Sequence, residues 1–239
     1  MKITAHRGLS SIAPENTLVA FKKAAESGCE WIELDVQLCA DLVPVIIHDQ
    51  SVARCTSGSG IVSQMTLAEL QSLDAGSWFD PKYCNERIPT LAQTLLLAKE
   101  VKLKVNIELK LYPEDDIELL CEKVSIVINE LGIDHSQLLF SSFELDALKL
   151  MQIKQPNIRR GLLWDTMPSD VFSLLADIEA YSAHCNYKFL TQRQAQILKQ
   201  KGYQIYCFTP NIPEEVALYW EWGVDMMISD SPQVYAAVR

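Results

Sequence analysis

The sequence lacks several features that mark well-known classes of protein. No apolar run approaches the ~18–20 residues of a membrane-spanning helix. Met1-Lys2 leads directly into strand-like sequence, without the apolar core of a signal peptide. The seven cysteines include no Cys-x-x-Cys pair, which argues against both a zinc cluster and a disulfide scaffold. We therefore expect a cytoplasmic protein with reduced thiols.

An excess of basic residues is also missing. The chain carries 21 Lys and Arg against 31 Asp and Glu, a formal net charge of −10. A general binder of nucleic acids or of anionic membranes would show the opposite balance, so both classes are disfavoured. A small phosphorylated substrate is still allowed, because a local cluster of cations can reverse the field inside one cleft.

What the chain does contain is a regular alternation of apolar strand-like runs and segments of helical period. Strands are expected at 2–6, 30–37, 43–48, 103–110, 138–142, 158–164, 180–184, 203–208 and 224–229, and helices at 16–27, 91–100, 114–131, 144–153, 169–177, 191–201, 213–222 and the C-terminus. Near-continuous apolar strands such as Ile205–Phe208 are typical of parallel sheets buried on both faces. About eight βα units, with 30–48 supplying two strand pieces to one of them, predict an α/β fold, the (β/α)8 TIM barrel.

Two further absences refine this prediction. No Gly-rich phosphate-binding fingerprint follows the first strand, which counts against a dinucleotide-binding fold. No low-complexity stretch or linker divides the chain, so we expect 1–239 to form a single domain. Residues 50–87 break the rhythm, with Ser-Gly-Ser-Gly at 57–60 and a polar stretch at 81–87. We interpret them as a small insertion after the second strand region, too short to hold a core of its own.

Acidic side chains gather where two expected strands end, which is where a barrel places its reactive groups. Glu33 and Asp35 lie two residues apart, so their side chains emerge on one face of a strand. Glu108 and Lys110 repeat this spacing on the neighbouring strand. Three carboxylates converging at a barrel mouth repel one another unless a cation lies between them. Oxygen ligands alone favour a hard divalent ion, Mg²⁺ or Ca²⁺, over zinc.

Cations and histidines complete this predicted site. Arg7 suits bidentate binding of a phosphate, and Lys110 adds a compact positive charge beside the metal. His6 and His48 both end strands close to the carboxylates, and unperturbed histidines titrate near neutrality, which fits them for proton transfer.

Simpler interpretations compete with each part of this site. His6-Arg7-Gly8 by itself would also suit a surface turn that ends a strand. Glu108 and Lys110 would also form a plain salt bridge that leaves Glu33 and Asp35 solvated. A single histidine in a barrel is more often structural than catalytic. The convergence of all these groups favours the metal and the acid–base pair.

The site residues belong to a longer series of sequence blocks that together form a recognisable pattern. In chain order they are His6-Arg7-Gly8, Ala13-Pro14-Glu15-Asn16-Thr17, Glu33-Leu34-Asp35-Val36, His48-Asp49, Asp74-Ala75-Gly76-Ser77-Trp78-Phe79, Ile88-Pro89-Thr90-Leu91, Asn106-Ile107-Glu108-Leu109-Lys110, Ser141-Ser142-Phe143-Glu144 and Gly223-Val224-Asp225. Over residues 3–232 the chain strongly resembles the glycerophosphodiester phosphodiesterase family, and closely its bacterial cytosolic branch. The resemblance implies a TIM barrel whose family-specific insertion matches 50–87, and hydrolysis of glycerophosphodiesters to glycerol 3-phosphate and an alcohol.

The resemblance also implies residue roles and a divalent cofactor. By motif position, His6 and His48 resemble the general base and general acid, Glu33, Asp35 and Glu108 the metal ligands, and Arg7 and Lys110 the phosphate-binding residues. Which histidine is the base, whether the ion is Mg²⁺ or Ca²⁺, which alcohol is preferred and whether water or a glycerol hydroxyl attacks phosphorus are questions that the residues leave open, as is the oligomeric state.

The chain departs from the family pattern at three positions. Leu42 replaces the usual glycine in the turn after Asp41, which we expect to be a harmless surface change. Phe208 replaces a frequent Trp or Tyr, and Pro210 replaces a valine. We expect these two changes to affect the preference for the alcohol and not the reaction itself.

Two other functions compete with hydrolysis of small glycerophosphodiesters. A related barrel phosphodiesterase acting on lipid would release a cyclic phosphate or a lysophospholipid product, but no amphipathic basic segment or exposed apolar anchor is evident. A non-catalytic sensor of phosphorylated ligands would need neither an acid nor a base, so both histidines argue against it. We therefore expect a small-molecule substrate, no nucleic-acid partner and no stable membrane association.

Overall fold

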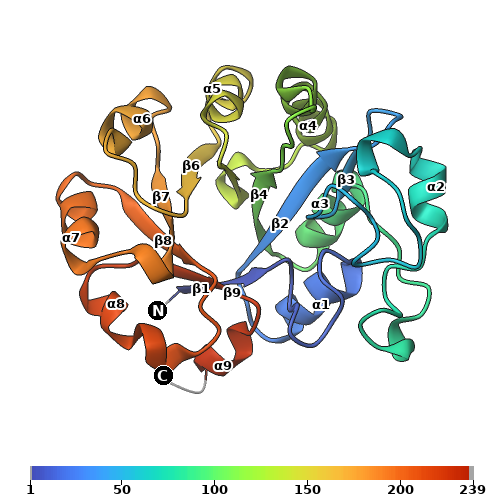
Figure 1. Cartoon of the computed structure of the whole chain (residues 1–239), viewed down its shortest axis with the longest axis horizontal. Coiled ribbons are helices and arrows are strands. Elements are labelled where there is room, and N and C mark those ends of the chain that lie inside the picture. Colours follow the sequence, from blue (N-terminus) through green and yellow to red (C-terminus); the bar gives the residue numbers. More distant parts are fainter. Residues whose placement is uncertain (1, 237–239) are drawn as a thin grey trace.

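The computed structural model describes residues 2–236, and within them eight parallel strands close into a barrel (Figure 1). Around the ring these strands are β1 (Lys2–His6), β2 (Trp31–Leu38), β4 (Lys104–Leu109), β5 (Leu138–Ser142), β6 (Arg159–Trp164), β7 (Ser182–Asn186), β8 (Gln204–Phe208) and β9 (Met226–Ser229). Parallel pairing of β9 with β1 closes the ring. The predicted TIM barrel is confirmed.

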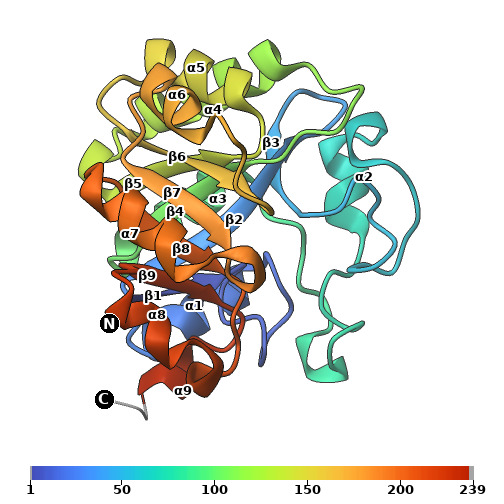
Figure 2. The same ribbon diagram turned by 60° about the vertical axis from the view of Figure 1, so that its left-hand side comes forward.

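Helices alternate with these strands and cover the outside of the barrel (Figures 1 and 2). They are α1 (Leu18–Glu26), α3 (Leu91–Glu100), α4 (Ile117–Leu131), α5 (Leu145–Lys154), α6 (Val171–Asp177), α7 (Gln192–Gln200), α8 (Ala217–Glu221) and α9 (Pro232–Ala236). Thr90 and Thr191 are the N-caps of α3 and α7, and each forms a capping box. The threonine hydroxyl accepts from the backbone N–H of a glutamine three residues on, and the side chain of that glutamine accepts from the backbone N–H of the threonine. Among the described residues, none of the helices is long and apolar enough to cross a bilayer.

A separate apolar cluster fills the barrel beneath the expected site. It contains Trp31, Leu139, Tyr206, Met226 and Ile228, which come from four different strands. Side chains two residues apart on a strand share a face, so Trp31 lies on the same face of β2 as Glu33, which lines the cavity at the barrel mouth. This cluster therefore points into the barrel. The interior of the barrel is therefore filled by side chains at this level.

The insertion packs against a short antiparallel strand. After β2, the chain turns back as β3 (Pro44–Ile46), which pairs antiparallel with the end of β2. These are the two strand pieces expected within 30–48. Within 50–87, the one α-helix is α2 (Leu67–Ser72), again begun by a capping box. Val45 on β3 packs in the same apolar cluster as Val62 and Leu70 of the insertion. The insertion thus shares its core with β3, beside the mouth of the barrel.

The turn between β2 and β3 contains a strained residue. The side chain of Leu42 is 41% exposed, as expected for a surface position, but its φ of +60° lies in the left-handed region. A non-glycine residue there costs about 1–2 kcal/mol, whereas glycine adds roughly 0.5–1 kcal/mol of chain entropy to the unfolded state. Leu42→Gly is therefore expected to raise Tm by about 1–4 °C in a calorimetric scan.

The matched control for this substitution is Leu218→Gly. Leu218 is also exposed, but it lies inside α8, where glycine is expected to destabilise the fold by about 1 kcal/mol. An unchanged or lower Tm for Leu42→Gly would show that the turn is not strained.

Candidate active site

All seven side chains predicted for the site converge at the carboxyl ends of the strands. A cavity of about 180 Å³ opens there, lined by His6, Arg7, Glu33, His48, Asn106, Glu108, Lys110, Ser141, Phe143, Leu163, Phe208, Thr209 and Ile228. Asp35, the remaining predicted residue, is buried beside the cavity and lies 3.3 Å from Nε of Arg7. The cavity has a charged part and an apolar part.

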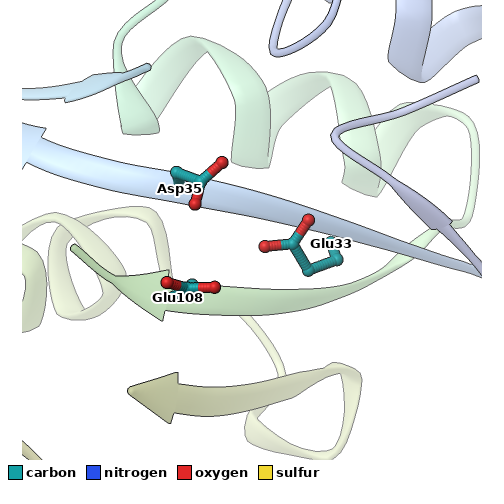
Figure 3. Close-up of side chains that lie close together, drawn as sticks. All are labelled: Glu33, Asp35 and Glu108. Atoms are coloured by element: carbon teal, nitrogen blue, oxygen red, sulfur yellow. The ribbon is translucent and has the colours of Figure 1, made fainter. Parts of the chain in front are cut away.

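The three predicted metal ligands form a compact buried cluster. Glu33, Asp35 and Glu108 each offer a carboxylate oxygen, and these oxygens lie within 4.8 Å of one another (Figure 3). Their exposed fractions are 2, 1 and 8%. The strand register explains the cluster, because Asp35 on β2 lies directly beside Glu108 on β4. The interpretation in which Glu33 and Asp35 are solvated is therefore wrong.

Electrostatics within this cluster favour a cation. Burial raises the pKa of Glu33 well above its ordinary value, and the neighbouring charges of Asp35 and Glu108 raise it further. Burial also raises the pKa of Glu108. Oε1 of Glu33 and Oδ1 of Asp35 are buried without a hydrogen-bond partner among the described residues. Buried, repelling and under-bonded oxygens fit a hard divalent ion, which offers positive charge and coordination at once.

Two cations border the cluster. The backbone N–H of Arg7 donates to Glu33 Oε2 at 3.0 Å, and its Nη1 donates to Glu15 Oε1 at 2.8 Å. Nζ of Lys110 donates to Glu108 Oε1 at 2.8 Å and lies 3.7 Å from Asp35 Oδ1. The ion pair between Glu108 and Lys110 is therefore present, but it forms alongside the cluster of three carboxylates and is not an alternative to that cluster.

Gly8 allows the loop that follows β1 to pack closely against α1. Its φ is +83°, and a Cβ at this position would lie 2.7 Å from the backbone carbon of Ala20 in α1. Any other residue would push the strand end away from the helix, so glycine is required for the close approach.

His6 is held by a carboxylate from the last strand. Its Nδ1 lies 2.6 Å from Oδ1 of Asp230, which follows β9, and its Nε2 lies 3.9 Å from Glu33 Oε2. Burial raises the pKa of Asp230, but hydrogen bonds from His6, Asn211 and Ser10 outweigh it and lower that pKa to about 2. An ionised carboxylate accepts hydrogen bonds, so Nδ1 carries the proton and Nε2 faces the cavity.

His48 has a similar partner on its own loop. Its Nδ1 lies 2.7 Å from Oδ1 of Asp49. The carbonyl of His48 accepts hydrogen bonds from the Tyr112 hydroxyl at 2.7 Å and from the Gln37 amide at 3.0 Å. Burial lowers the pKa of His48, which favours the neutral ring. The cavity is therefore bordered by two histidines, each with its Nδ1 bound to a carboxylate.

Several residues around the site had no role assigned from the sequence. Asp230 and Asp49 support the histidines, Glu15 supports Arg7, and Asn16 donates from Nδ2 to Asp35 Oδ2 at 2.9 Å. Asp49 follows a strand-end histidine directly, a signal that could have identified it. The role of Asp230 depends on closure of the barrel, which brings the last strand beside the first.

The sequence of the chain is similar to those of known proteins. A sequence profile described as the glycerophosphoryl diester phosphodiesterase family matches residues 6–234. A glycerophosphodiester phosphodiesterase from Caldanaerobacter subterraneus subsp. tengcongensis is 37% identical over 235 residues, which cover 97% of this chain and 94% of that protein.

Solved structures resemble the whole chain as well. A phosphodiesterase from Oleispira antarctica, in complex with the product sn-glycerol-3-phosphate, aligns with a TM-score of 0.94 at 34% identity, over 99% of this chain and 96% of that one. A glycerophosphodiester phosphodiesterase from Agrobacterium tumefaciens aligns with a TM-score of 0.82 at 31% identity, over 99% of both chains.

Proposed function

Because this chain belongs to the glycerophosphoryl diester phosphodiesterase family and is a phosphoric diester hydrolase, we propose a specific reaction and mechanism for it. The reaction is hydrolysis of small glycerophosphodiesters to glycerol 3-phosphate and an alcohol. The observation that carries the proposal is one cavity bordered by a buried carboxylate cluster, two cations and two carboxylate-bound histidines. The product bound to the Oleispira antarctica phosphodiesterase supports this choice of substrate class.

One Mg²⁺ or Ca²⁺ is the proposed cofactor. Glu33, Asp35 and Glu108 would hold it, and it would supply Lewis-acid stabilisation of negative charge on the phosphate. Arg7 and Lys110 add fixed positive charge at the same edge of the cavity, where they would bind the non-bridging phosphate oxygens. With these charges a phosphodiester anion is attracted to the cavity, although the whole chain is acidic.

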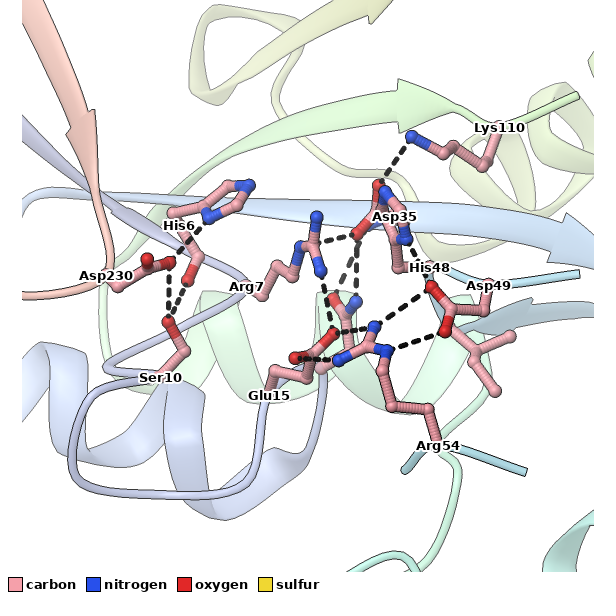
Figure 4. Close-up of polar contacts among 12 residues, drawn as sticks. His6, Arg7, Ser10, Glu15, Asp35, His48, Asp49, Arg54, Lys110 and Asp230 are labelled. Atoms are coloured by element: carbon pink, nitrogen blue, oxygen red, sulfur yellow. Dashed lines mark hydrogen bonds and ion pairs between the residues drawn. The ribbon is translucent and has the colours of Figure 1, made fainter. Parts of the chain in front are cut away.

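His6 and His48 are the proposed acid–base pair. With Nδ1 bound to Asp230 or Asp49, each ring presents Nε2 for proton transfer. In the proposed in-line displacement, one histidine takes the proton of the nucleophile and the other gives a proton to the oxygen of the departing alcohol. Figure 4 shows Arg7 between the two rings, where it would orient the phosphate.

The apolar part of the cavity is the proposed contact for substrate carbon atoms. Phe143 and Phe208 meet edge to face with their ring centroids 6.0 Å apart, and Leu163 lines the same cavity. Phe208, where the chain departs from the family pattern, lines this part of the cavity, which supports an effect of that departure on the preference for the alcohol. We further propose that the protein is located in the cytoplasm and that residues 1–239 form a single domain.

Turnover of glycerophosphocholine tests the proposed function. The purified protein is expected to release glycerol 3-phosphate and choline when Mg²⁺ or Ca²⁺ is added, measured by enzymatic detection of both products. Reaction in H₂¹⁸O, combined with trapping of any cyclic phosphate before water opens it, will show whether water or a glycerol hydroxyl attacks phosphorus first. Failure to hydrolyse glycerophosphocholine, glycerophosphoethanolamine and glycerophosphoglycerol with either ion would refute the proposal.

A further inference from the structure

One arginine outside the predicted site, Arg54, binds the carboxylate partners of both His48 and Arg7. Arg54 lies in the insertion, and its guanidinium donates from Nε and Nη2 to the two oxygens of Asp49, at 2.6 and 3.0 Å. From Nη1 and Nη2 it also donates to the two oxygens of Glu15, at 2.7 and 2.8 Å. Figure 4 shows the guanidinium between these two carboxylates.

Each of the two carboxylates holds a different group of the proposed mechanism. Asp49 binds Nδ1 of His48, and Glu15 accepts from Nη1 of Arg7. The result is an unbroken chain of hydrogen bonds from Arg7 through Glu15, Arg54 and Asp49 to His48. It crosses from the loop after β1 to the loop after β3 by way of the insertion.

Arg54 also lowers the pKa values of both carboxyl groups. Its hydrogen bonds are the largest cause of the lowered pKa of Asp49. Burial raises the pKa of Glu15, but the hydrogen bonds and charges of Arg54 and Arg7 outweigh it, and that pKa is lowered as well. As anions, both carboxylates are acceptors of hydrogen bonds, which requires a proton on Nδ1 of His48 and fixes the orientation of Arg7.

We propose that Arg54 is a positioning residue that sets the tautomer of His48 and the orientation of Arg7 together. This inference rests on the proposed role of His48 in proton transfer. A guanidinium can bind two carboxylates along two of its edges at once, whereas the compact ammonium of lysine cannot. The insertion therefore contributes a residue to the site, since its packing on the barrel brings Arg54 to Asp49 and Glu15.

Substitution of Arg54 tests the proposal by kinetics. Arg54→Gln is expected to lower kcat by about 10–100-fold, the loss typical of groups that orient a catalytic side chain, and to raise KM through Arg7. Arg54→Lys is expected to recover a part of kcat. The control is Arg87→Gln in the same insertion, since Arg87 is exposed and donates to the carbonyl of Leu73, outside the network. This control is expected to keep wild-type kcat and KM.

A double-mutant cycle separates positioning from loss of structure. If Arg54 acts through Asp49, the double variant Arg54→Gln/Asp49→Asn is expected to be no slower than the slower single variant. Multiplicative losses would overturn the proposal. Thermal unfolding of every variant identifies any that is only partly folded, and Arg54→Lys then serves as the milder substitution.

The imidazole nitrogens give a readout that does not depend on turnover. Long-range ¹H–¹⁵N spectra of the wild type are expected to show His48 protonated at Nδ1 and unprotonated at Nε2, and Arg54→Gln is expected to show a mixture of tautomers. An unchanged spectrum with unchanged kcat would overturn the role of Arg54. If His48→Ala itself keeps wild-type turnover, the proposed function fails; if His48→Ala is inactive while Arg54→Gln equals the wild type, this inference alone fails.

Discussion

His48→Ala is expected to lower kcat by about 10²–10⁴-fold while the fold stays intact, because alanine leaves one side of the phosphate without a proton donor or acceptor. The loop is expected to keep its shape, since Gln37 and Tyr112 hold the backbone carbonyl of residue 48 and not the imidazole. Steady-state kinetics on glycerophosphocholine, together with circular dichroism and thermal unfolding, measure the effect. His6→Ala is expected to give a loss of similar size.

The matched control for both substitutions is His135→Ala. His135 lies in a short 3₁₀ turn immediately before β5, at the opposite end of the strands from the cavity. This variant is expected to keep wild-type kcat. Near-wild-type turnover by both His6→Ala and His48→Ala would refute the acid–base pair.

Removal of the divalent cation is expected to abolish turnover and to change how stability depends on pH. The pKa values of Glu33 and Glu108 are raised in the fold, so the metal-free protein binds more protons than its unfolded chain once the pH exceeds about 4.5. Its stability should therefore fall as the pH rises through these raised values. The lowered pKa values of Asp35 and Asp49 act at more acidic pH, where stability is lost as those groups become protonated.

Bound Mg²⁺ or Ca²⁺ is expected to reverse this trend, because the ion requires the ionised carboxylates. At 100 times its Kd the ion adds about 2.7 kcal/mol, which raises Tm by roughly 5–10 °C, and this shift is expected to grow from pH 5 to pH 8. Calorimetric scans with chelator or with added ion measure it, and Glu33→Gln is expected to lose both the shift and its pH dependence. Full turnover in chelator, or rescue by Zn²⁺ but not by Mg²⁺ or Ca²⁺, would contradict the oxygen-ligand site.

The sequence predicted those parts of the molecule that depend on local pattern. Strands buried on both faces read as apolar runs, so their alternation with helices identified the barrel. Glu33, Asp35 and Glu108 were found because a spacing of two on a strand already implies a shared face. What escaped prediction depends on closure and docking: Asp230 reaches His6 because the ring closes, and Arg54 sits in a segment without any periodicity.

The strain at Leu42 shows a second limit. The sequence indicated a surface change there, and exposure of the side chain agrees. The cost lies in the backbone, where φ is +60°, and a side chain alone does not reveal φ. Only the geometry of the turn that joins β2 and β3 shows why glycine suits that position.

The reversed direction of β3 makes the register of the β2–β3 hairpin a determinant of where His48 lies. Within the described sheet, β3 runs antiparallel to β2, so His48 follows a returning strand, whereas His6 is the last residue of barrel strand β1. The N–H of Ile47 donates to the carbonyl of Asp35 at 3.0 Å, which fastens the returning strand one residue before His48. A slip of one residue would turn the imidazole to the other face of the strand. The spacing of the proposed acid and base is thus set by the length of one tight turn, a property of the main chain that no side chain at the cavity encodes.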